Sequence, residues 1–121
     1  MEKKHRLSRS ADFQRVYRQG KSVAGRYAVL YYFERPGAGG DETRLGLSVS
    51  RKVGAAVVRN QVKRTLKESF RSLQEQVAPG YDYVIIARPG LAEFIEKSSF
   101  SEVAEMMNEL FRRANLIQEA E

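Results

Sequence analysis

The chain has 121 residues, with 21 Lys and Arg against 15 Asp and Glu, no Cys and a single His. This length suits one domain, so we treat residues 1–121 as a single domain. The lack of Cys excludes disulfides, thiolate metal sites and a cysteine nucleophile, and one His excludes zinc sites built on several imidazoles. No apolar run is long enough for a membrane span or a signal peptide, so we expect a cytoplasmic protein.

Hydrophobic periodicity and turn residues predict alternating helices and strands. In chain order these are a helix over residues 10–20, a short extra strand near 21–24, strands over 27–33 and 44–50, a helix over 57–77, a strand over 81–87 and a helix after Ser99. Ser10 is the predicted N-cap of the first helix and Gly20 its C-terminal glycine. Ser99 and Glu102 resemble a capping box.

This order, α-β-β-α-β-α, predicts an α+β protein built as a two-layer α/β sandwich around a mixed, about four-stranded sheet. The strand at 44–50, the long helix and the strand at 81–87 form a crossover unit, for which the general rule favours a right-handed connection. In the strand at 44–50, Leu45, Leu47 and Val49 point to one face, and Gly46, Ser48 and Ser50 point to the other.

Charge is divided unequally along the chain. Residues 1–71 hold 17 Lys and Arg against 6 Asp and Glu, a net charge of +11, whereas residues 72–121 hold 4 against 9, a net charge of −5. A concentrated basic segment in one small domain favours a polyanion partner, and nucleic acid in particular.

The long helix carries the densest group of cations. Arg59, Lys63, Lys67 and Arg71 recur every four residues, so they form one cationic arc even though like charges at this spacing repel. An anionic partner would relieve that repulsion, whereas a merely solvated helix face would mix both signs of charge. The predicted RNA-binding residues of this helix and its approach are Arg51, Lys52, Arg59, Asn60, Gln61, Lys63, Arg64, Lys67 and Arg71.

A second candidate site is aromatic. Phe13 and Tyr17 on the first helix, with Tyr27, Tyr31 or Phe33 on the strand at 27–33, could flank a groove in which unpaired bases stack. Ser48 and Ser50 are assigned to the same cleft. For Tyr27, Tyr32 and Phe33, the sequence leaves open whether the rings belong to the core or to the cleft.

The segment from Val53 to Lys67 closely resembles the signature of the bacterial ribonuclease P protein subunit, which centres on Arg-Asn-Arg followed by an apolar residue and Lys-Arg. Arg59, Asn60, Lys63 and Arg64 match that signature, and Gln61 stands where the commonest form has arginine. The resemblance extends to residues 5–7, 12–20, 45–50 and 83–88, so it covers most of the chain in the family's order.

The resemblance implies a fold of the ribosomal protein S5 domain 2-like type with a left-handed crossover, against the general rule. It also implies a ribonucleoprotein endonuclease that removes the 5′ leader of precursor tRNA. In that family the RNA subunit is the catalyst and binds most of the Mg²⁺. The protein binds the RNA subunit through its basic helix and the leader in a cleft, whose aromatic residues match Phe13, Tyr17 and Tyr31 here. One protein is then expected per RNA subunit, and the protein carries no catalytic or metal-binding residue of its own.

Three alternatives remain open. A general structured-RNA-binding protein, ribosomal or assembly, would share the basic surface but would not recognise a leader. A protein-only nuclease needs paired metal-binding carboxylates, whereas Asp12, Asp41, Glu42 and Asp82 are scattered along the chain, and Ser-His-Asp chemistry would have to use His5 in an N-terminal segment expected to be mobile. Binding to an anionic membrane surface is permitted by the charge but not favoured, since the apolar faces are needed for the core.

Overall fold

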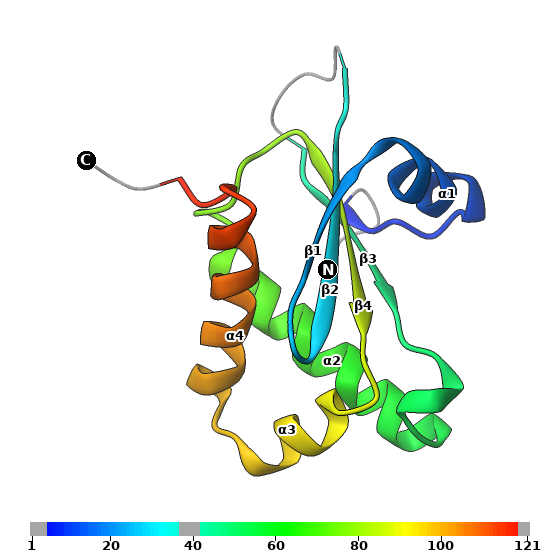
Figure 1. Ribbon diagram of the computed structural model, residues 1–121, viewed down its shortest axis with the longest axis vertical. Helices are drawn as coiled ribbons and strands as arrows, with labels where there is room; N and C mark the ends of the chain where they lie inside the picture. The colour runs from blue at the N-terminus through cyan, green and yellow to red at the C-terminus, as the bar shows by residue number, and fades with distance from the viewer. Residues whose placement is uncertain (1–4, 37–41, 119–121) are drawn as a thin grey trace.

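The protein is described here from a computed structural model, which describes residues 5–36 and 42–118 (Figure 1). Four strands form one mixed sheet in the spatial order β1-β2-β4-β3. The elements are α1 (Ser10–Gln19), β1 (Lys21–Ala24), β2 (Ala28–Glu34), β3 (Arg44–Ser48), the 3-10 helix η2 (Arg51–Val53), α2 (Ala56–Leu73), β4 (Tyr81–Ala87), α3 (Leu91–Lys97) and α4 (Phe100–Arg113).

The crossover unit predicted from the sequence is present. β3 and β4 are neighbouring parallel strands with Leu45 opposite Tyr83, and α2 joins them. β4 is also antiparallel to β2, with Leu30 opposite Ile85, so it has a paired strand on each side, as β2 does. The near-continuous apolar run of β4 is explained by that central place, since five of its seven residues are buried. The hand of the crossover stays a prediction.

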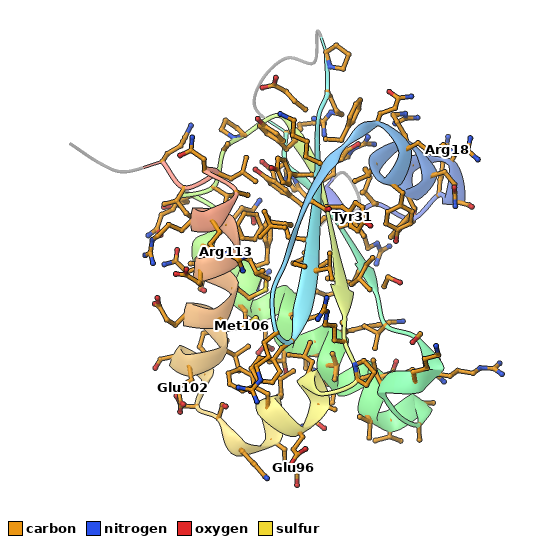
Figure 2. All side chains as sticks on the ribbon, in the orientation of Figure 1. Arg18, Tyr31, Glu96, Glu102, Met106 and Arg113 are labelled. Atoms are coloured by element: carbon orange, nitrogen blue, oxygen red, sulfur yellow. The ribbon has the colours of Figure 1, made fainter. Side chains whose placement is uncertain are left out.

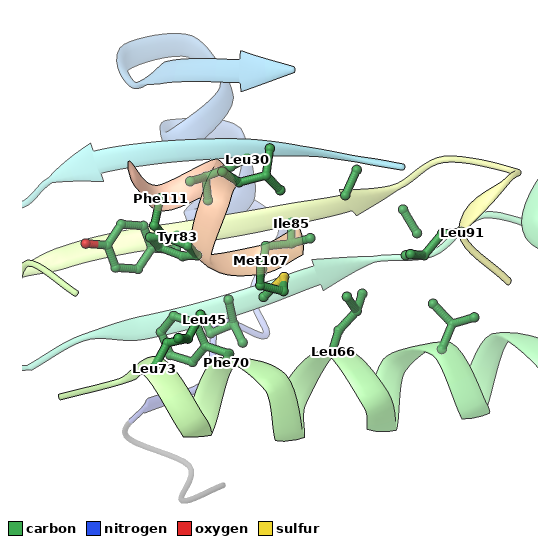
Figure 3. Close-up of a cluster of buried hydrophobic side chains, with 14 of the residues drawn as sticks. Leu30, Leu45, Leu66, Phe70, Leu73, Tyr83, Ile85, Leu91, Met107 and Phe111 are labelled. Carbon is green, nitrogen blue, oxygen red and sulfur yellow. The ribbon is translucent and has the colours of Figure 1, made fainter. Parts of the chain in front are cut away.

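The main core lies between the sheet and the helices α2, α3 and α4 (Figure 3). Leu66, Phe70 and Leu73 of α2 point up at the sheet, and Tyr83 packs edge-on against Phe111 of α4 with ring centroids 5.0 Å apart. Along each strand, the side chains that face this core alternate with side chains that face the opposite side of the sheet. Burial of these large apolar groups supplies most of the stabilising free energy of a domain of this size.

The opposite face of the sheet carries a smaller apolar cluster under α1. Val16 of α1 and Val84 of β4 are fully buried there, together with Leu7 from the N-terminal segment. Figure 1 shows α1 apart from α2, α3 and α4, across the sheet from them. To the two layers expected from the sequence, α1 therefore adds a partial third layer.

Several local predictions need correction. Arg9 is the N-cap residue of α1, and Ser10 is its first helical residue. Gly20 does end α1, but its backbone is extended, and glycine is needed for space because a Cβ would lie 2.5 Å from the carbonyl oxygens of Val16 and Tyr32. The capping box of Ser99 and Glu102 is confirmed, with both reciprocal hydrogen bonds formed.

The ends of two longer elements also differ from the sequence prediction. α2 ends at Leu73 rather than at Val77, because the backbone of Val77 pairs with Ile117 of the C-terminal segment. The strand predicted to reach Ser50 ends at Ser48. The short helix α3 was missed, although Leu91, Phe94 and Ile95 have helical spacing that could have revealed it.

The start of the described chain is held to the sheet, contrary to the expected mobility. Leu7 donates its backbone N–H to the carbonyl of Leu45 at 3.0 Å, and His5 Nδ1 lies 3.1 Å from the Thr43 carbonyl oxygen. This segment therefore covers part of the outer edge of β3, which would otherwise be an unpaired strand edge.

Candidate nucleic-acid interface

The cationic arc predicted on the long helix lies on α2 and faces the outer edge of β3. Arg59, Lys63 and Lys67 are half-buried, and Arg71, one turn further on, is exposed. Lys63 and Lys67 line a cavity of about 130 Å³ with Arg6 of the N-terminal segment and the apolar side chains of Leu45 and Leu47. The aliphatic parts of the two lysine side chains cover the edge of the core, and the positive charges of Arg6, Lys63 and Lys67 lie around the cavity.

These cations have no anionic partner in the part of the chain that is described. The ion pairs found within residues 5–36 and 42–118 involve Arg15, Arg35, Arg44, Lys97 and Arg112, and none involves a cation of η2 or α2. The Nε atom of Arg59 is buried and has no hydrogen-bond partner among these residues. A positively charged arc without internal compensation is suited to bind a polyanion.

The remaining RNA-binding candidates are exposed residues of η2 and of the first half of α2. Arg51 and Lys52 lie in η2, and Asn60, Gln61 and Arg64 project from the outer side of the helix. Gly54 joins η2 to α2 with a φ of +156°, a conformation that side chains rarely adopt, and a Cβ there would lie 2.9 Å from Val58. This glycine is therefore required by the turn that places Arg51 and Lys52 beside the helix.

The aromatic residues predicted to flank a cleft are brought together on the α1 face of the sheet. The rings of Tyr17 and Tyr31 meet edge to face with centroids 5.1 Å apart, and the Phe13 ring lies 6.3 Å from that of Tyr17. All three are only partly buried. Figure 2 shows Tyr31 beside α1. Partly exposed rings on a sheet face are the form that base-stacking platforms take in single-strand-binding proteins.

Gly46 of β3 makes room for this arrangement. A Cβ on Gly46 would lie 2.6 Å from the Phe13 Cζ atom and 3.1 Å from the Leu7 Cβ atom. The Phe13 ring therefore rests directly on the strand backbone. Leu7 contacts this aromatic surface and also lines the cationic cavity, so the two candidate surfaces adjoin across the edge of β3.

The two serines assigned to the cleft differ in position. Ser48 is half-buried at the end of β3, opposite Ile86 of β4, and its side chain is close to the Tyr17 hydroxyl. Burial raises the pKa of Tyr17, contact with Ser48 lowers it, and the neighbouring Tyr31 raises it. Ser50 lies beyond the end of β3, exposed at the turn into η2.

The structure shows where the three rings lie whose place, in the core or at the cleft, the sequence left open. Tyr27 packs against the main core and stacks on Phe94 of α3 with centroids 4.3 Å apart, and Tyr32 lies on the same side of the sheet. Phe33 faces the other way and joins the cluster under α1. Alternation along β2 separates Tyr32 from Phe33, because successive residues of a strand point to opposite faces, whereas Tyr27 precedes the strand and is placed by its stacking on Phe94.

A buried charge network beside the aromatic surface was not predicted. Asp82 of β4 is fully buried and accepts hydrogen bonds from Arg35 at 2.7 Å and from two nitrogens of Arg44 at 2.8 Å. Arg44 also lies 4.0 Å from Asp12 of α1, which pairs with Arg15 at 3.1 Å. Hydrogen bonding to Asp82 raises the pKa of Arg44. No local sequence signal pointed to this network, because the pairing of Arg44 with Asp82 depends on the register of β3 and β4.

The helices α3 and α4 carry several exposed glutamates. Glu96 and Glu102 project outward from α3 and α4 in Figure 2, away from α1 and Tyr31. α4 also carries Arg112 and Arg113 in its last turn, so this part of the surface has charges of both signs.

Within residues 5–36 and 42–118, no group of three His, Asp or Glu side chains is arranged to hold a metal ion. Asp12 and Asp82 are engaged by arginines, and Asp41 lies outside the described residues. In the same part of the chain, no helix has the length and apolar character needed to cross a membrane.

Comparison with known proteins gives one consistent result. Residues 1–115 match the family model described as Ribonuclease P. The Ribonuclease P protein component of Geobacillus thermodenitrificans is 45% identical over 114 residues, covering 94% of this chain and 89% of that protein. That of Caldanaerobacter subterraneus is 42% identical over 120 residues, covering 99% and 97%.

Solved structures agree with the sequence relatives. The RNase P protein of Staphylococcus aureus superimposes with a TM-score of 0.81 at 32% identity, over 94% of this chain and 98% of that one. The RNase P protein from Thermotoga maritima superimposes with a TM-score of 0.79 at 36% identity, over 89% of this chain and 96% of that one.

Proposed function

Because the chain belongs to the ribonuclease P protein family, we infer that it is a subunit of ribonuclease P and acts in the 5′ maturation of tRNA. Its partners are accordingly the RNA of ribonuclease P and the tRNA substrate. The structure is consistent with this role, since the same α+β fold with a mixed four-stranded sheet is found in the RNase P proteins of other bacteria.

Within that role we propose a division of labour between the two surfaces. The cationic arc of α2, with η2, binds the RNA subunit. The aromatic surface formed by Phe13, Tyr17 and Tyr31 binds the single-stranded 5′ leader of precursor tRNA. The observation that carries the proposal is that the two surfaces adjoin across the edge of β3, with Leu7 contacting both. A leader could then leave the RNA subunit and cross directly onto the sheet.

The protein's contribution to phosphodiester cleavage follows from its charge rather than from a nucleophile or a metal site. We propose that the RNA subunit carries out catalysis and binds most of the Mg²⁺, in a complex of one protein per RNA, in the cytoplasm. Cations on α2 lower the repulsion between substrate and RNA phosphates and so strengthen both substrate and Mg²⁺ binding. The carboxylates Asp12 and Asp82 are already paired with arginines, which supports this assignment.

The test is to reconstitute the protein with a bacterial ribonuclease P RNA and to measure affinity for precursor and for mature tRNA. Wild type should bind the precursor more tightly. Tyr17→Ala should lose about 1–3 kcal/mol of that preference, the contribution of one stacked base. Glu96→Gln, a change at an exposed position of α3, is the control and should alter neither affinity. Equal affinity of wild type for both tRNAs would overturn leader binding, and would favour a general structured-RNA-binding protein.

The roles of the two subunits need a separate measurement. Purified protein with Mg²⁺ should not cleave precursor tRNA unless the RNA is added. Cleavage by the protein alone would contradict catalysis by the RNA.

Loss of thermal stability in the Tyr17→Ala variant, without loss of precursor preference, would assign that ring to the core.

A further inference from the structure

The charge network beside the aromatic surface joins α1 to the sheet. We propose that Arg44 and Asp12 are positioning residues, which hold α1 at the distance from the sheet that the leader cleft requires. The proposal rests on the leader-binding role proposed above and adds residues that do not themselves contact the leader. It concerns the separation of α1 and the sheet rather than the stacking surface itself.

Arg44 is suited to this task because its guanidinium is held on one side. Its Nε and Nη2 atoms each donate to one oxygen of the fully buried Asp82, both at 2.8 Å. Arg35 binds the same carboxylate at 2.7 Å. A planar fork bound at two points has little freedom to rotate. Arg44 therefore presents a positive charge at a defined place on the α1 face of β3.

Asp12 is the residue of α1 that meets this charge. Its Oδ1 atom lies 4.0 Å from Arg44 Nη2 and 3.1 Å from Arg15 Nη1. The next residue in α1 is Phe13, whose ring rests on Gly46, two residues from Arg44 on the same face of β3. A change in the separation of Asp12 and Arg44 would thus move the Phe13 ring over the sheet.

Other attachments of α1 to the sheet are few. Val16 is the buried residue of this helix, and the remaining apolar contacts are made by the partly buried rings of Phe13 and Tyr17. The second aromatic contact, Tyr17 with Tyr31, lies one helical turn after Phe13. A helix held by so small an apolar area depends more than usual on its ion pair for its exact placement.

The test uses Asp12→Asn, which keeps the shape of the side chain and leaves the buried pairs of Asp82 intact. Removing a carboxylate beside a polyanion site should tighten RNA binding if electrostatics alone matter. If Asp12 positions α1, Asp12→Asn should have the opposite effect: affinity for precursor tRNA should fall about three- to tenfold, with no loss of affinity for mature tRNA. Glu34→Gln, the same change at the end of β2, is the charge-matched control and should not weaken precursor binding.

Coupling to the cleft gives a second measurement. If Asp12 acts through α1, the effects of Asp12→Asn and Tyr17→Ala on precursor affinity should be smaller together than their sum. Tighter or unchanged precursor binding by Asp12→Asn, or additive effects, would overturn the proposal. So would a fall in melting temperature with equal losses for precursor and mature tRNA. If wild type itself does not distinguish the two tRNAs, the leader-binding role fails instead.

Discussion

Replacing Gly46 with alanine tests the contact on which the Phe13 ring of the aromatic surface rests. The backbone of Gly46 is that of an ordinary strand, so alanine is allowed there, and the whole effect arises from the new methyl group. That Cβ would lie 2.6 Å from Phe13 Cζ and 2.8 Å from Phe13 Cε1. Carbon atoms in contact need about 3.5–4.0 Å, so the ring must move outward by about 1 Å.

Two effects are expected from the added methyl group: it strains the packing around Phe13, and it changes the shape of the aromatic surface. Overpacking of this kind destabilises a protein by about 1–3 kcal/mol. We expect the low end, because Phe13 is partly exposed and sits on a helix that can shift, and this corresponds to a fall in melting temperature of roughly 4 °C. Displacement of the ring should also weaken the preference for precursor over mature tRNA.

Thermal unfolding and tRNA affinity should be measured for Gly46→Ala, Phe13→Ala and the double variant. Because alanine at 46 clashes mainly with the Phe13 ring, its cost should largely vanish once that ring is removed. Unchanged stability in Gly46→Ala, or a full additional cost in the double variant, would refute the packing of Phe13 on Gly46.

Two further predictions concern the cationic arc and the core. Arg64→Ala should weaken binding to the RNA subunit, reduce its salt dependence by about one phosphate contact and leave melting unchanged, since Arg64 is exposed; an unaltered slope of log affinity against log salt would favour a solvated helix face. Burial raises the pKa of Tyr83 far above its ordinary value of about 10, so its contribution to stability is complete below pH 10 and is lost as pH rises beyond it. Melting temperature should therefore fall above pH 10, and less steeply in Tyr83→Phe, whose loss of the 2.6 Å hydrogen bond to Ala78 costs about 1 kcal/mol at neutral pH. Equal slopes in both proteins would contradict this assignment.

Local patterns in the sequence were sufficient for most of the elements. Periodicity and capping residues located α2, β4 and the start of α4, because these signals act over a few residues. Alternation in β3 correctly separated Leu45 and Leu47 from Gly46 and Ser48. The end of α2 was predicted too late because tertiary pairing of Val77 with Ile117 overrides helix propensity there.

The sequence by itself determined the chemistry of this protein. It carries a basic arc at four-residue spacing and the three aromatic residues of the second candidate site, and it lacks the residues for a thiolate or multi-histidine metal site. Tertiary structure decided which residues meet. Only the sheet order placed Arg44 between Asp82 and Asp12, and only the approach of α1 to β3 placed the Phe13 ring on Gly46. Contacts between distant segments depend on strand register and helix packing, which no short stretch of sequence specifies.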